Sequence, residues 1–130
     1  MKKKATSLRR RKKIRVLIAD DSGLIRNTLA CLCSLIPRVE VVGQAANGLE
    51  AIAAIRKLQP DVVTLDIRMP RMSGVEVLKA VKAEQLDCTV IILSVMTQEI
   101  CLKKCLELGA DHVFDKATEF EKALEVLRKL

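Results

Sequence analysis

Apolar residues gather in five short runs, and longer stretches with helical periodicity separate these runs. The runs are nearly continuous instead of alternating with polar residues, which predicts strands covered on both faces, as in a parallel sheet. The predicted strands span residues 14–19, 39–45, 61–65, 89–95 and 112–114.

The stretches between the runs carry apolar residues at spacings of three and four, which predicts helices. These helices are expected over residues 24–36, 48–58, 75–85, 98–108 and from about 119 to 130. Several end signals support them. Asn47 suits an N-cap, Gly109 suits the position after a helix, and Thr118 with Glu121 has capping-box spacing.

The alternation of strands and helices predicts βαβ units with right-handed crossovers. The fold class is therefore α/β, a doubly wound (βα)5 domain over residues 14–130. We expect a parallel five-stranded sheet in the flavodoxin-like order 2-1-3-4-5, with helices on both faces.

The excess of positive charge lies at the N-terminus. Residues 2–13 hold eight Lys or Arg and no acid, whereas residues 14–130 hold 15 basic and 16 acidic residues. We expect residues 1–13 to form a solvated, disordered tail. Contact of this tail with nucleic acid or anionic lipid stays an alternative. No apolar run suits a signal peptide or a membrane span, which predicts a cytoplasmic protein without membrane contact.

The composition indicates which residues form the core and argues against base-stacking surfaces, disulfides and zinc sites. Two Phe and no Tyr or Trp imply an aliphatic core and argue against aromatic surfaces that stack nucleic-acid bases. An odd number of cysteines without a secretory signal argues against a disulfide framework, and their spacing does not match zinc ligands. We expect all five to be small buried hydrophobic residues: Cys31, Cys33, Cys88, Cys101 and Cys105.

Polar residues stand where the predicted strands end. The first strand runs into Asp20 and Asp21, Asp66 follows the third, Ser94 lies near the end of the fourth, and Lys116 follows the fifth. Ligands bind beyond the carboxyl ends of such strands, so we expect these side chains to converge. Three carboxylates together repel one another, and Mg²⁺ would relieve this repulsion. With an ammonium and a hydroxyl beside it, such a pocket suits a phosphoryl group, and one carboxylate could act as the nucleophile.

Four motifs in this order carry a resemblance to a known family. They are "IADDS" (18–22), "VVTLDIRMPRMSG" (62–74), "IILSV" (91–95) and "GADHVFDK" (109–116). Over residues 14–130 the sequence resembles the receiver domains of bacterial two-component response regulators. Its ending is similar to that of stand-alone receivers.

The resemblance implies a division of roles around the metal. Asp66 would be the phosphoacceptor, and it would ligate Mg²⁺ directly together with Asp21, while Asp20 would act mainly through water. The backbone carbonyl of Arg68 would be a further ligand. Arg68 and Met96 stand at positions that tune the lifetime of the phosphoryl group in this family.

The resemblance also implies how the phosphoryl group is read, with two departures from the family pattern. Ser94 would bond the phosphoryl group and change position when it arrives, and Lys116 would pair first with Asp66 and then with the phosphoryl. Val113 stands where the family carries a switching aromatic residue, and the neighbouring Phe114 should point to the other face of its strand. Ala117 stands where the family usually has a proline that follows a cis bond. Because a cis bond is costly before other residues, the bond between Lys116 and Ala117 could be trans, and the loop could then differ from that of the family.

The implied function is a phosphoacceptor that takes its phosphoryl group from a histidine kinase or phosphotransfer protein onto Asp66. An unidentified downstream protein would read the face formed by the fourth helix, fifth strand and fifth helix. We expect a monomer or weak dimer and no turnover of an external substrate. Two alternatives stay open: an interaction module that is never phosphorylated, and the receiver of a DNA-binding regulator whose output domain is absent. A phosphatase is disfavoured because Asp20 and Asp21 are adjacent and not spaced Asp-x-Asp.

Overall fold

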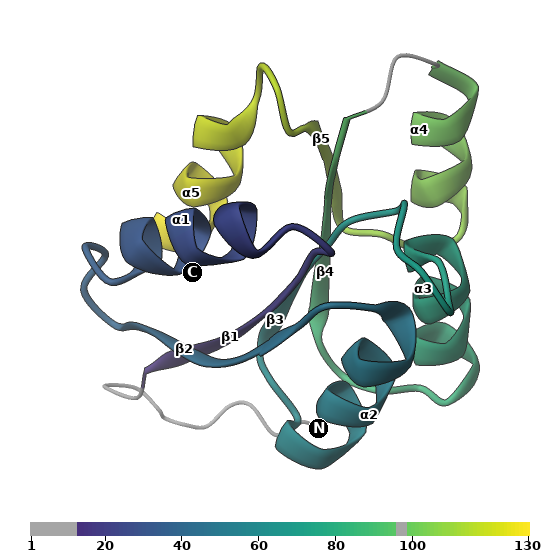
Figure 1. Ribbon diagram of the computed structural model, residues 1–130, viewed down its shortest axis with the longest axis horizontal. Helices are drawn as coiled ribbons and strands as arrows, with labels where there is room; N and C mark the ends of the chain where they lie inside the picture. Colours follow the sequence, from purple (N-terminus) through teal and green to yellow (C-terminus); the bar gives the residue numbers. More distant parts are fainter. Residues whose placement is uncertain (1–12, 96–98) are drawn as a thin grey trace.

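The computed structural model describes residues 13–95 and 99–130. The interpretation of the basic tail, except for Lys13, and that of Met96 therefore lie outside the described residues. Strands and helices alternate along the chain (Figure 1): β1 (Ile14–Ala19), α1 (Gly23–Cys33), β2 (Val39–Ala45), α2 (Gly48–Leu58), β3 (Val62–Leu65), α3 (Gly74–Ala83), β4 (Thr89–Ser94), α4 (Glu99–Glu107), β5 (His112–Asp115) and α5 (Phe120–Arg128).

The five strands form one parallel sheet in the order β2-β1-β3-β4-β5, which confirms the predicted topology. The register aligns the strands at their carboxyl ends, where Ala19 pairs with Leu65 and Ser94 pairs with Asp115. Whatever follows these residues must therefore emerge at the same edge of the sheet.

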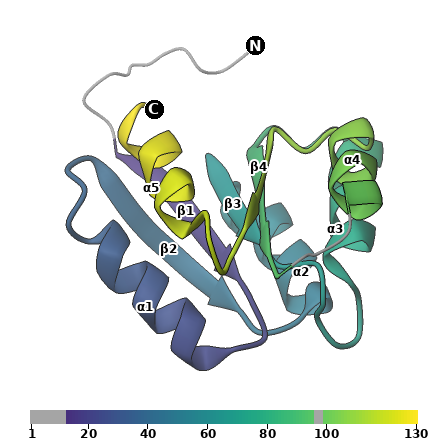
Figure 2. The same cartoon turned by 90° about the horizontal axis from the view of Figure 1, so that it is seen from above.

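Each face of the sheet is covered by its own helices (Figures 1 and 2). One core lies under α2, α3 and α4 and includes Val63 and Leu65, whereas the other lies under α1 and α5 and includes Val62. Val113 packs against the first core and Phe114 against the second, which confirms that they point to opposite faces of β5. Because both faces are buried, the strands are continuous apolar runs.

The end signals of two helices are confirmed. The Asn47 side chain accepts a hydrogen bond from Glu50 N at 2.9 Å and caps α2. After α4, Gly109 takes a φ of +106°. The Gly109 N–H donates to the Leu106 carbonyl at 3.0 Å. This left-handed conformation is one that glycine adopts without a Cβ penalty.

The first helix is shorter than predicted: it ends at Cys33 and does not continue to residue 36. The Ser34 hydroxyl donates to the Cys31 carbonyl at 2.6 Å, so the side chain competes for a carbonyl of the last turn. Ile36 remains buried in the core below α1. The apolar pattern therefore continued beyond the point at which the backbone stopped being helical.

Two further expectations are wrong. The helix α5 begins at Phe120 with Glu119 at the N-cap, so Thr118 and Glu121 form no capping box. Cys31 is exposed, because residues two apart on a helix lie about 200° apart and Cys33 occupies the buried face. Cys33 and Cys105 are buried as expected, and Cys88 is half-buried. Within the described parts of the chain, no helix is long and apolar enough to cross a membrane.

Candidate functional site

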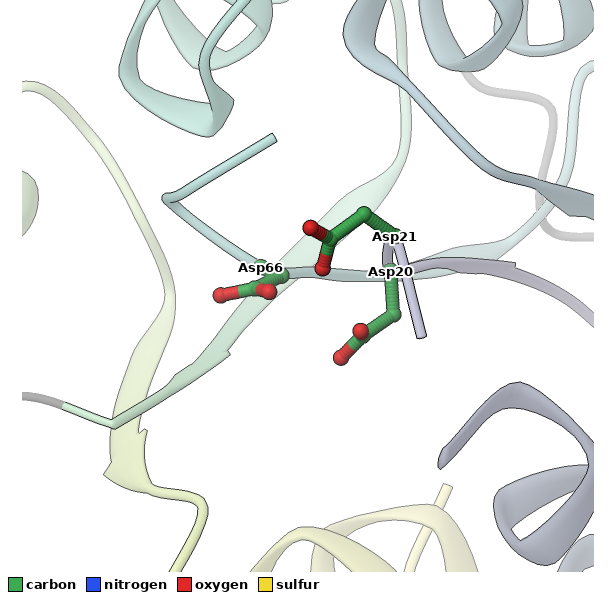
Figure 3. Close-up of side chains that lie close together, drawn as sticks. All are labelled: Asp20, Asp21 and Asp66. Carbon is green, nitrogen blue, oxygen red and sulfur yellow. The ribbon is translucent and has the colours of Figure 1, made fainter. Parts of the chain in front are cut away.

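Three carboxylates meet beyond the carboxyl ends of β1 and β3 (Figure 3). Asp20 and Asp21 directly follow β1, and Asp66 directly follows β3. One oxygen atom from each of the three lies within 4.8 Å of the other two. Asp20 and Asp66 are buried, whereas Asp21 is exposed. The predicted acidic cluster is therefore present and opens to solvent on the Asp21 side.

Backbone hydrogen bonds fix the chain where the carboxylates begin. The Asp20 N–H donates to Ala45 O at 3.0 Å, and the Asp66 N–H donates to Ala19 O at 3.0 Å, so the ladders extend one residue past each strand. The Asp20 side chain is held as well, since its Oδ1 accepts from the Ser22 N–H at 2.9 Å. Ser22 in turn caps α1, and this ties the Asp20 carboxylate to the start of that helix.

Arg26 is a residue near the site that the sequence analysis missed. Its Nη1 donates to the Asp20 backbone carbonyl at 2.8 Å, and its Nε donates to Gln44 Oε1 at 3.1 Å. The guanidinium therefore braces the turn after β1 against β2. Its position in the first turn of a helix that begins two residues after Asp21 was the available signal.

Lys116 and Ser94 reach the same cluster from β5 and β4. The Lys116 ammonium lies 2.7 Å from Asp20 Oδ2 and 3.2 Å from Asp66 Oδ2. The buried Ser94 hydroxyl donates to Asp66 Oδ1 at 2.8 Å. Both oxygens of Asp66 are therefore engaged, and the five side chains expected to converge do so.

The charge of the cluster is only partly balanced. Burial of the ammonium is the largest influence on the pKa of Lys116 and lowers it, but hydrogen bonds and charge attraction from Asp20 and Asp66 together outweigh burial. The pKa of Lys116 is therefore raised, and the side chain stays charged. One ammonium still faces three carboxylates.

The donor atoms of the cluster fit a hard divalent cation. All three are carboxylate oxygens, which Mg²⁺ prefers, and its remaining positions can take water or phosphate oxygens. Within the described chain, the exposed Asp21 carboxylate makes no hydrogen bond or ion pair, so it is free to bind. The Asp cluster could therefore hold a metal ion, with Mg²⁺ as the best match.

The loop between β3 and α3 lies close to Asp66. The Arg68 N–H approaches Asp66 Oδ1 at 3.4 Å, whereas a ligand role for the Arg68 carbonyl stays a prediction. At the far end of the loop, the Gly74 N–H donates to Ile67 O at 2.8 Å. A Cβ on Gly74 would lie 2.1 Å from the Asp66 carbonyl oxygen. Gly74 directly precedes the helix predicted over residues 75–85, but the sequence gave no sign of this contact.

The two departures from the family pattern can be placed in the structure. Val113 is half-buried against the core under α2, α3 and α4, so an aliphatic side chain fills this position of β5. The peptide bonds of the described residues are trans, which includes the bond between Lys116 and Ala117. Lys116 nevertheless reaches Asp20 and Asp66.

Comparisons with known proteins give a consistent result. The family model described as "Response regulator receiver domain" matches residues 16–128. A protein-glutamate methylesterase/protein-glutamine glutaminase from Clostridium acetobutylicum is 39% identical over 116 residues, which cover 88% of this chain and 33% of that protein. This chain thus spans about a third of that relative's length.

Two solved structures share the fold. The response regulator domain of Thermotoga maritima CheB has a TM-score of 0.82 and 32% identity, over 91% of this chain and 96% of that one. The CheX-CheY-BeF3-Mg+2 complex of Borrelia burgdorferi matches with a TM-score of 0.77 and 29% identity, over 88% of this chain and 90% of that one. Together with the family match and the acidic cluster, they show that the chain belongs to the response regulator receiver domain family.

Proposed function

We propose that this receiver takes a phosphoryl group from a phosphohistidine onto Asp66. The observation that carries the proposal is that Asp20, Asp21, Lys116 and Ser94 all surround this one carboxylate. A carboxylate oxygen of Asp66 attacks phosphorus in line. The new P–O bond forms as the P–N bond breaks, and the imidazole leaves with the bonding electron pair and takes up a proton.

In that step some residues would hold Mg²⁺ and another would stabilise the charge of the phosphoryl group. Asp21 and Asp66 would ligate Mg²⁺ directly, Asp20 would act through water, and the Arg68 backbone carbonyl would add a ligand. When bound, Mg²⁺ supplies positive charge that stabilises the phosphoryl oxygens in the transition state. Lys116, whose ammonium lies 3.2 Å from Asp66 Oδ2, would stabilise the same charge.

The Ser94 hydroxyl contacts Asp66 before phosphorylation. Its hydroxyl donates to Asp66 Oδ1 at 2.8 Å, so it stands beside the oxygens at which the phosphoryl group would be attached. We propose that the hydroxyl passes from Asp66 to a phosphoryl oxygen and that the start of α4 follows. A partner that binds this state better than the unphosphorylated one is then recruited.

The partners follow from this chemistry. The donor is a histidine kinase or a histidine phosphotransfer protein, and a downstream protein reads the face made by α4, β5 and α5. The Borrelia relative, which was solved with beryllofluoride and Mg²⁺ and in complex with CheX, supports both the phosphoryl chemistry and a protein partner. We propose a monomer or weak dimer that turns over no external substrate.

The proposal is tested by incubating the chain with acetyl phosphate and Mg²⁺ and measuring phosphoryl transfer by intact mass. We expect one phosphoryl group that is stable in acid and labile in base. Asp66→Asn should carry none, and Asp21→Asn should need more Mg²⁺ than Asp20→Asn. An unlabelled wild-type chain, or equal labelling of Asp66→Asn, would overturn the proposal.

A second candidate function is an interaction module that is never phosphorylated. It is favoured by Val113, because the face of β5 on which Val113 packs then has no aromatic side chain that could follow Ser94, while Phe114 packs on the opposite face. Addition of Mg²⁺ and beryllofluoride, monitored by amide NMR, separates the two functions. The module predicts no shifts at Ser94 and the following loop, whereas the phosphoacceptor predicts shifts there.

A further inference from the structure

We propose that Asp115 and Glu119 are positioning residues for Lys116, and that they hold the β5–α5 turn (residues 115–119) in the shape that delivers its ammonium to the acidic cluster. The proposal rests on the function proposed above, in which the Lys116 ammonium must lie beside Asp66 to stabilise the phosphoryl charge. Neither Asp115 nor Glu119 touches Asp20, Asp21 or Asp66, so both must act through the turn.

The Asp115 side chain closes the turn around Lys116. Its Oδ1 accepts a hydrogen bond from the Ala117 N–H at 2.8 Å, so the bond spans the lysine. The Asp115 carbonyl accepts from Glu119 N at 2.7 Å and from Thr118 N at 3.3 Å. An aspartate that bonds the backbone two residues further on fixes a turn locally. Here the central residue of that turn is the lysine of the site.

Glu119 closes the same turn from its other end. Its Oε1 accepts from the Asp115 N–H at 3.0 Å, and its Oε2 lies 2.9 Å from Lys122 Nζ. Because β5 is the edge strand, its outer N–H groups have no neighbouring strand, and the carboxylate satisfies one of them. The hydrogen bond from the Asp115 N–H, with a smaller contribution from Lys122, lowers the pKa of Glu119, so the acceptor is charged at neutral pH.

This use of Glu119 explains why it does not cap its own helix. It stands at the N-cap of α5, yet its side chain makes no capping hydrogen bond. Glutamate is not among the favoured N-cap residues, and here its carboxylate reaches back to the end of β5. The residue therefore contributes to the turn before the helix.

The turn has little else to fix it. Ala117 is exposed and has no ring to restrict its backbone. The Lys116 N–H donates to Ser94 O at 3.0 Å, which anchors only the start of the turn. The ammonium contact with Asp66 is already 3.2 Å long, and a displacement of about 1 Å would break it. The Asp115 and Glu119 hydrogen bonds therefore decide whether Lys116 reaches both carboxylates.

A rival explanation is that Asp115 acts only through its charge. The two are separable because Asn also has an Oδ1 that can accept from the Ala117 N–H. Positioning predicts that Asp115→Ala slows phosphorylation by acetyl phosphate and Mg²⁺ at least about tenfold, since a 1 Å misplacement can cost about 100-fold. Asp115→Asn should stay within about twofold of the wild type. Equal effects of Ala and Asn would overturn the proposal.

Glu119 provides an independent pair of variants with a matched control. Glu119→Ala should slow the reaction, and Glu119→Gln should restore most of the rate, because its carbonyl oxygen can still accept from Asp115 N. Glu121→Ala removes a carboxylate from the same helix that pairs with Arg128 instead, and it should leave the rate unchanged. A loss of rate in Glu121→Ala as large as that in Glu119→Ala would overturn the proposal.

A double variant tests whether the effect passes through Lys116. In a Lys116→Met background, Asp115→Ala should change the residual rate by no more than about twofold, since the group it positions is gone. A purely structural role predicts that the two losses multiply. A multiplied loss would therefore overturn the proposal.

One measurement is independent of phosphorylation, so that this proposal and the proposed function can fail separately. In ¹³C-lysine-labelled protein, Lys116→Met assigns the ε-methylene signal of Lys116. This signal should be shifted in the wild type and in Asp115→Asn, and it should move to the position of exposed lysines in Asp115→Ala. A wild type that takes no phosphoryl group but shows this pattern would refute the proposed function and support the positioning. An unchanged signal in Asp115→Ala would refute the positioning.

Discussion

Gly74→Ala is expected to disturb Asp66, the proposed phosphoacceptor, although Gly74 carries no side chain. The added Cβ would lie 2.1 Å from the Asp66 carbonyl oxygen and 2.8 Å from the Ile67 Cα, both of them backbone atoms that cannot rotate away. An ordinary contact begins at 3.4 Å, so α3 and the end of β3 must separate by about 1 Å. Overpacking of this kind costs about 1–3 kcal/mol of stability.

The same displacement predicts a functional loss. Because Asp66 is held between Ser94 and Lys116 by contacts of 2.8 and 3.2 Å, a shift of its backbone changes both. We expect Gly74→Ala to slow phosphorylation by acetyl phosphate and Mg²⁺ by about 10- to 100-fold, the effect of a 1 Å misplacement. Urea denaturation gives the stability, and intact mass over time gives the rate.

Gly23→Ala is the matched control. Gly23 and Gly74 are each the first residue of a helix and follow a serine N-cap, Ser22 or Ser73. A Cβ on Gly23 would meet only Arg26 Nη2, at an ordinary 3.6 Å. This variant should be as stable as the wild type or gain up to about 1 kcal/mol, with an unchanged rate. Equal stability and rate in both variants would refute the reasoning.

Three further predictions follow from buried groups. The buried Thr64 Oγ1 has no hydrogen-bond partner among the described residues, so Thr64→Val should gain about 1 kcal/mol in urea denaturation, and a loss would contradict this. Lys116→Met leaves Asp20 and Asp66 without their ammonium, so it should lose about 3–5 kcal/mol without metal, and Mg²⁺ should raise its Tm more than that of the wild type. Burial raises the pKa of Cys33 from 9.0 to about 11, so the folded thiol holds its proton where the unfolded one loses it. Its stabilisation is complete below pH 9 and lost towards pH 11, and Cys33→Ala should flatten that decline in denaturation curves.

The elements that position the site were predictable because their signals are local. A continuous apolar run marks a strand buried on both faces, and the first polar residue after it marks the end of the strand. Asp20, Asp66 and Lys116 could therefore be placed at one edge before any contact was known, since parallel strands end together. The motif resemblance then assigned them roles that spacing alone does not give.

The remaining features depend on individual hydrogen bonds and close contacts that the pattern of apolar residues does not report. The end of α1 was missed because Leu35 and Ile36 continue the apolar pattern after the Ser34 hydroxyl has turned to Cys31 O. The start of α5 was missed because its capping signal was local, whereas Glu119 is committed to the end of β5. The approach of Gly74 to Asp66 likewise joins residues eight positions apart through a folded loop. Patterns along the chain do not encode such contacts.

The two adjacent aspartates show how much the structure adds to the motif. The sequence "ADDS" (19–22) does not distinguish the two aspartates, and only the family resemblance implied that Asp21 is the direct metal ligand. In the structure, Asp20 is 3% exposed, and its two oxygens accept from the Ser22 N–H and from Lys116. Both oxygens of Asp66 are likewise engaged, by Ser94 and Lys116. Asp21 is exposed and makes no hydrogen bond or ion pair within the described chain, so its oxygens are open to a cation, while the division between direct and water-mediated ligands stays a prediction of the resemblance.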